Sequence, residues 1–110
     1  MKTKAVIPVA QLNDELRIYG AGGRVILTQA IADLLPNERL AVIQAVREFE
    51  EFSQMTDPHM EHAFGVLMVN GRKVFWKIDY DYKRFLNDTT RPGDAAAIVR
   101  QLTVMLADEY

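Results

Sequence analysis

The side chains best suited to chemistry gather in one short polar segment, residues 53–62. His59 and His62, the two histidines of the chain, lie in it together with Asp57. Imidazole and carboxylate groups that lie close together can exchange a proton, hold a divalent metal ion or form a structural hydrogen bond. Which of these applies depends on the groups that the neighbouring strands bring to His62.

The dipeptide Asn70-Gly71 predicts a tight β-hairpin between two apolar runs. A two-residue type I′ turn requires positive φ at both central positions, which asparagine and glycine tolerate best. Such a turn fixes the register, and counting back along both strands places His62 opposite Asp79. The sequence therefore predicts a His62–Asp79 pair at the open end of the hairpin.

Three interpretations of this pair stay open. In the first, Asp79 accepts a hydrogen bond from His62 and ties the loop to the strand, as cross-strand polar pairs commonly do. In the second, His62 and Asp79 form a general acid–base dyad, with His59 as a further catalytic candidate. In the third, a metal ion takes its ligands from Asp57, His59, His62 and Asp79. The sequence has no GxSxG nucleophile motif, and its histidines are not spaced as in the HExxH motif of zinc enzymes.

The predicted hairpin has two unlike faces. On the apolar face Gly65 lies opposite Trp76, and the absent side chain of the glycine leaves room for the indole. We expect this face to pack against helices. The other face mixes apolar and charged residues and is expected to be partly covered; it includes Phe64, Val66, Met68, Lys73, Phe75 and Lys77.

Further elements are predicted around this hairpin. An apolar stripe at helical spacing runs from Val9 to Tyr19 before a glycine-rich end, a short helix follows Thr28, and a longer helix spans 36–52. A last helix is predicted from Asp94, burying Ile98, Leu102 and Met105. Residues 25–27 are predicted to add a third strand. The fold class is therefore α+β, one domain over residues 1–110. A small antiparallel sheet of about three strands, with the hairpin at its centre, packs against three to four helices.

Composition narrows the function classes. Fifteen acidic residues against thirteen basic ones give a net charge of -2, which provides no strong attraction to nucleic acid or to a membrane surface. Cysteine is absent, so disulfides and thiolate chemistry are excluded. No stretch has the length of a membrane span, the first residues make a poor signal peptide, and no nucleotide-binding motif occurs. We expect a cytoplasmic protein without a cofactor.

Three blocks of the sequence resemble a bacterial family catalogued as domain of unknown function 3768. They are residues 57–65 (DPHMEHAFG), 75–80 (FWKIDY) and 102–110 (LTVMLADEY), with shorter similarity at 12–14 and 23–28. Where the family usually has an acid after the histidine, this chain has Ala63. The resemblance implies no established activity. It implies a small accessory protein of a bacterium or mobile element, and such proteins can inhibit a larger machine such as a CRISPR effector.

The sequence thus favours non-catalytic binding to a protein partner, with a small hydrolase or metal-dependent enzyme as the alternative. Nucleic acid is an unlikely partner because the net charge is negative. The expected binding surface is either the acidic end of the long helix together with the C-terminal acids, or the mixed face of the hairpin. The partner-binding candidates are Glu48, Glu51, Asp108, Glu109, Lys73 and Lys77.

Overall fold

A computed structural model describes residues 8–82 and 98–110. Their elements, in chain order, are α1 (Val9–Tyr19), β1 (Gly23–Leu27), α2 (Gln29–Ala32), α3 (Pro36–Arg47), β2 (Phe64–Val69), β3 (Arg72–Tyr82), β4 (Ile98–Leu106) and the 3-10 turn η2 (Ala107–Glu109). The α+β class predicted from the sequence is confirmed. None of the described helices is both long enough and apolar enough to cross a lipid bilayer.

The four strands form one mixed sheet in the order β1-β4-β3-β2. The hairpin β2–β3 has the predicted register, with Gly65 opposite Trp76, and Asn70 and Gly71 both take positive φ. The predicted third strand exists as β1, but it pairs in parallel with β4. The sheet has four strands, close to the expected number of about three. The expectation of an antiparallel sheet with the hairpin at its centre is wrong, because the pair β1–β4 is parallel and β2 lies at an edge.

The largest correction concerns the C-terminal segment. The helix predicted to bury Ile98, Leu102 and Met105 is instead the strand β4, which lies between β1 and β3. Its proposed N-cap, Asp94, lies outside the described residues. Leu102 and Val104 alternate onto the helix-covered face of the sheet, and Arg100, on that same face, is also buried. Because the charged residue Arg100 occupies a core position, the alternation of apolar and polar residues that indicates a strand is interrupted in the sequence.

The core lies between the sheet and the helices, and Trp76 at its centre is fully buried. A Cβ added to Gly65 would lie 2.6 Å from Cε2 of Trp76, so the predicted space for the indole is confirmed. The rings of Phe49 and Phe52, which follow α3, pack edge-on against the indole. The buried aliphatic side chains around it are Leu16, Ile31, Val42, Val46, Val69, Val74, Ile78, Leu102 and Val104.

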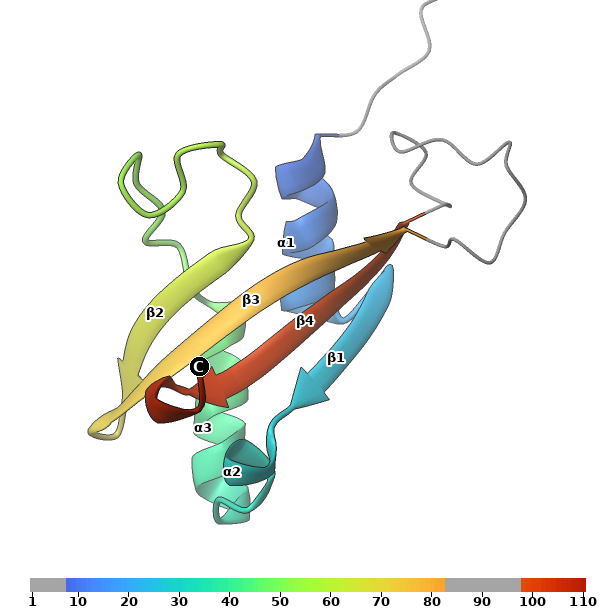
Figure 1. Cartoon of the computed structure of the whole chain (residues 1–110). Coiled ribbons are helices and arrows are strands. Elements are labelled where there is room, and N and C mark those ends of the chain that lie inside the picture. The colour runs from blue at the N-terminus through green and yellow to red at the C-terminus, as the bar shows by residue number, and fades with distance from the viewer. Residues whose placement is uncertain (1–7, 83–97) are drawn as a thin grey trace, which may run out of the picture.

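The helices cover one face of the sheet (Figure 1). In that view α1 and α3 lie behind the strands, and the near side carries the C-terminal turn η2. The mixed face of the hairpin thus points away from the helices, as predicted. The long helix ends at Arg47, earlier than predicted, and the chain then runs through the polar segment to β2.

The buried face of α1 differs from the predicted apolar stripe. Tyr19 is 76% exposed, whereas Asn13, Leu16 and Arg17 are buried. Two of these three side chains are polar, so α1 brings hydrogen-bonding groups into the interior. They lead to the candidate site.

Candidate functional site

The polar segment before β2 is shaped by one buried carboxylate. Asp57 accepts hydrogen bonds from the backbone N–H of Glu61 at 2.9 Å and of His62 at 3.2 Å. Met60 and His62 both take positive φ, which bends the chain just before the strand begins. The side chain of His62 is consequently turned toward α1.

The imidazole of His62 lies between two carboxylates. Its Nδ1 is 3.0 Å from Oδ1 of Asp14 on α1, and its Nε2 is 3.8 Å from Oδ2 of Asp57. The ring stacks on Phe52 with a centroid separation of 3.8 Å and an interplanar angle of 6°. Because the ring is held by polar and aromatic contacts together, its position is well defined.

Arg17 extends this network to the end of α3. Its guanidinium donates to Oδ1 of Asp14 at 3.1 Å and to the carbonyl oxygens of Val46 and Arg47 at 2.8 and 3.0 Å. The same group lies over the rings of Phe52 and Trp76. The last carbonyls of a helix lack partners within it, so a cation there is favourable.

Asn13 completes the network on the other side of α1. Its amide donates to the carbonyl oxygen of Glu61 at 2.9 Å and to the hydroxyl of Tyr80 at 2.7 Å. Burial raises the pKa of Tyr80, and the hydrogen bond from Asn13 opposes part of that rise. The phenol therefore stays protonated at neutral pH.

We call Asn13, Asp14, Arg17, Asp57 and His62 the polar latch. Its members join α1 to the polar segment and to the end of α3. Both nitrogens of the imidazole face carboxylates that are themselves hydrogen-bonded within the protein. In residues 8–82 and 98–110 no three side chains of His, Asp, Glu or Cys are grouped so as to hold a metal ion. The contacts given for these five side chains are hydrogen bonds, ion pairs and aromatic contacts with other parts of the described chain.

The predicted His62–Asp79 pair does not form. The hairpin register ends at Phe64 opposite Lys77, and the positive φ of His62 takes its ring away from the strand. Asp79 is exposed on β3, with its Oδ2 3.4 Å from Nζ of Lys77. Of the four predicted metal ligands, the structure brings Asp57 and His62 together. His59 is exposed in the loop, and among the described residues no hydrogen bond or ion pair engages its ring.

The predicted partner-binding acids differ in their availability. Glu48, Glu51 and Asp108 are exposed. Glu109 is engaged within the protein, because its carboxylate accepts a hydrogen bond from the Thr28 hydroxyl at 2.7 Å and another from the Leu106 N–H at 2.8 Å. The hydrogen bond from Thr28, followed by the one from Leu106, lowers the pKa of Glu109.

The two predicted lysines lie on the uncovered side of the hairpin. Three directly opposed pairs occupy it: Phe64 with Lys77, Val66 with Phe75, and Met68 with Lys73. Tyr110 adds a third aromatic ring, with its centroid 5.2 Å from that of Phe75 and 6.2 Å from that of Phe64. We call these six strand residues and Tyr110 the hairpin face.

Sequence reasoning missed the three residues that α1 contributes to the polar latch. Asp14 and Arg17 are spaced as a helical ion pair, and Asn13 and Arg17 flank Leu16 on its buried side. That spacing could have indicated a polar buried face of α1, but the prediction for this helix followed its apolar residues instead.

Comparison with known proteins assigns the chain to a family, and the function of that family is unknown. A family model described as "Protein of unknown function (DUF3768)" matches residues 27–109, which confirms the resemblance seen in the sequence. Neither the curated proteins nor the solved structures contain a match. The residues of α1 lie before the matched region.

Proposed function

We propose that this chain, which belongs to the DUF3768 family of proteins of unknown function, is a non-catalytic binding protein that recognises a protein partner through the hairpin face. The observation that carries this proposal is the one-sided sheet. Helices cover the face that holds Trp76, whereas on the opposite face Val66, Met68 and Tyr110 are exposed and Phe64 and Phe75 are half-buried.

The composition of the hairpin face is that of an interface core. Met68 is 64% exposed, and Val66 and Tyr110 are exposed as well. Aromatic residues and methionine are enriched at protein interfaces, and contiguous apolar patches on a protein surface commonly mark such sites. The edge-to-face packing of Phe64, Phe75 and Tyr110 makes a preformed aromatic surface.

The charges of the hairpin face indicate the chemistry of the partner. Lys73 and Lys77 lie at two of its three opposed pairs, and Lys77 also lies over the ring of Tyr110. Because Nζ of Lys77 is 3.4 Å from the Asp79 carboxylate, Lys73 is the lysine of this face that has no ion pair among the described residues. A partner with an apolar patch bordered by carboxylates would complement this pattern, and opposite charges at an interface raise the rate of association. Phe75 lies between the lysines along β3 and would be the central contact.

A narrower form of this proposal is that the protein inhibits a larger machine, such as a CRISPR effector. A small protein without a catalytic centre can inhibit such a machine by covering a surface that the machine needs. The polar latch supports the non-catalytic part of the proposal, since its imidazole is held within a structural network.

Photo-crosslinking in the native host tests the proposal. A photoreactive phenylalanine analogue would replace Met68 on the hairpin face or, as a matched control, Met55, which is 92% exposed in the polar segment. We expect a discrete protein adduct from position 68 and none from position 55. Equal adducts from both positions, or none from position 68, would overturn the proposal.

A further inference from the structure

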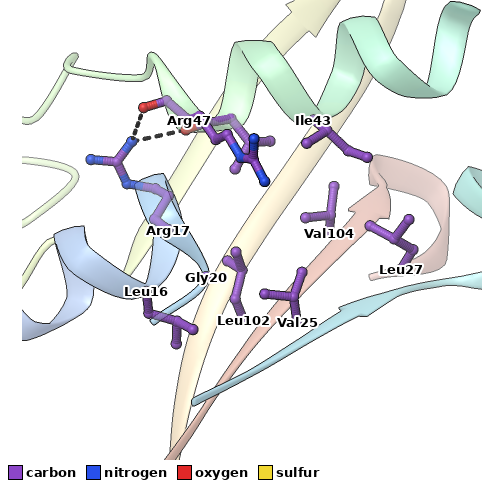
Figure 2. Close-up of a pocket in the computed structure, with 10 residues that line it drawn as sticks. Leu16, Arg17, Gly20, Val25, Leu27, Ile43, Arg47, Leu102 and Val104 are labelled. Atoms are coloured by element: carbon purple, nitrogen blue, oxygen red, sulfur yellow. Dashed lines mark hydrogen bonds between the residues drawn. The ribbon is translucent and has the colours of Figure 1, made fainter. Parts of the chain in front are cut away.

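A concave site lies on the side of the sheet opposite the hairpin face, between the ends of α1 and α3 and the sheet. It is a cavity of about 240 Å³. Figure 2 shows its residues converging from α1, α3, β1 and β4. Its lining consists of Leu16, Arg17, Gly20, Val25, Leu27, Ile43, Val46, Arg47, Leu102 and Val104.

The walls of this cavity are apolar, and its size suits a small organic molecule. Seven of the ten lining residues are aliphatic, and none carries a carboxylate. An engineered apolar cavity of about 150 Å³ is known to bind benzene. The cavity next to β1 is larger, so it has room for a short alkyl chain or a substituted aromatic ring.

The polar part of the lining is cationic. Arg47 is exposed at the end of α3, and no residue of the described chain forms an ion pair with its guanidinium. Arg17 is buried; two of its nitrogens are hydrogen-bonded, while its Nε has no partner among the described residues. The carboxylate of Asp14 neutralises Arg17. The charge of Arg47 therefore remains available at an apolar cavity.

We infer that this cavity binds a small apolar carboxylate, an alkyl or aryl carboxylic acid in its ionised form. The aliphatic walls would take the hydrocarbon part, and the guanidinium of Arg47 would bind the carboxylate, for which its planar donor geometry is suited. This site lies on the helix-covered side of the sheet. It is separate from the hairpin face and does not depend on the proposed function.

Isothermal titration calorimetry with octanoate tests this inference, with 1-octanol as the uncharged counterpart. We expect octanoate to bind the wild type, and Arg47→Gln to weaken that binding about tenfold while leaving the binding of octanol unchanged. Arg24→Gln is the control: Arg24 is exposed on β1, but its side chain lies on the opposite face of the sheet from Val25 and Leu27. It should leave both affinities unchanged.

A second variant tests the location of the hydrocarbon part. Val25 lines the cavity and is about half exposed, so Val25→Trp fills the space without opening the core. With an unchanged circular dichroism spectrum, it should weaken octanoate and octanol alike. The inference is overturned if millimolar octanoate gives no binding to the wild type. It is also overturned if octanol binds as tightly as octanoate, or if Arg47→Gln and Arg24→Gln have equal effects.

Discussion

Replacing His62 by alanine separates a structural histidine from a catalytic one. The substitution removes the contact between Nδ1 and Asp14 at 3.0 Å and the stack on Phe52. A hydrogen bond to a charged group contributes about 1.5–3 kcal/mol to stability, and an aromatic pair about 0.5–1.5 kcal/mol. The side chains of His62 and Asp14 are 27% and 33% exposed, so solvent screening reduces the contribution of the hydrogen bond between them. The expected loss is about 1–3 kcal/mol.

Urea unfolding followed by tryptophan fluorescence measures this loss, since Trp76 is the single tryptophan and lies in the core. His59→Ala is the matched control. Its ring is exposed and forms no hydrogen bond or ion pair with the described residues, so its effect should stay within about 0.5 kcal/mol. The reasoning is refuted if the two variants have equal stability, or if folded His62→Ala keeps full stability but loses a biological activity that His59→Ala retains.

Three further predictions concern packing and hydrogen bonds. Gly65→Ala places a methyl group against the indole and should destabilise the protein by about 1–3 kcal/mol in urea unfolding; a neutral effect would show that the indole is not held there. Tyr80→Phe removes an acceptor of the Asn13 amide and should cost about 0.5–1.5 kcal/mol by the same assay, whereas no loss would mean that this hydrogen bond is not formed in solution. Glu109→Gln should lower stability at pH 7, because a carboxylate whose pKa is lowered by folding stabilises the native state above its ordinary value of 4.5. That difference should disappear as the pH falls below 4.5 through the lowered pKa, and a difference that persists in acid would contradict the role of the ionised carboxylate.

The parts of the fold that could be predicted are those fixed by neighbouring residues. Asn70 and Gly71 determine the turn, the turn determines the register, and the register places Gly65 opposite Trp76. The uncovered face of the hairpin follows from the same alternation. Each of these steps depends on sequence separations of a few residues.

The strand β4 could not be predicted in this way, because distant partners decide its conformation. Its apolar residues also fit a helical spacing, and Arg100 interrupts their alternation on the core face. The guanidinium of Arg100 lies over the ring of Tyr80, its cross-strand neighbour. That contact exists once β3 and β4 have paired.

The predicted His62–Asp79 pair is wrong because the regular pairing of β2 with β3 ends before His62. Counting pairs beyond Phe64 assumed that the strand continues. The carbonyl oxygen of Ala63 still accepts the N–H of Ile78, but the next N–H that would pair with β3, that of Glu61, donates to the Asp57 carboxylate instead. His62 then turns toward Asp14, a residue 48 positions away in the sequence. A local register rule contains no information about that helix.

The affinity of the crosslinked partner for two matched variants tests the central claim most directly. Met68→Glu places a negative charge on the hairpin face, and Met55→Glu makes the same change on the polar segment. With purified proteins in surface plasmon resonance, Met68→Glu should raise the Kd at least about tenfold, which corresponds to about 1.4 kcal/mol, and Met55→Glu should leave it unchanged. Equal Kd values for wild type and Met68→Glu would contradict the assignment of the hairpin face as the binding surface.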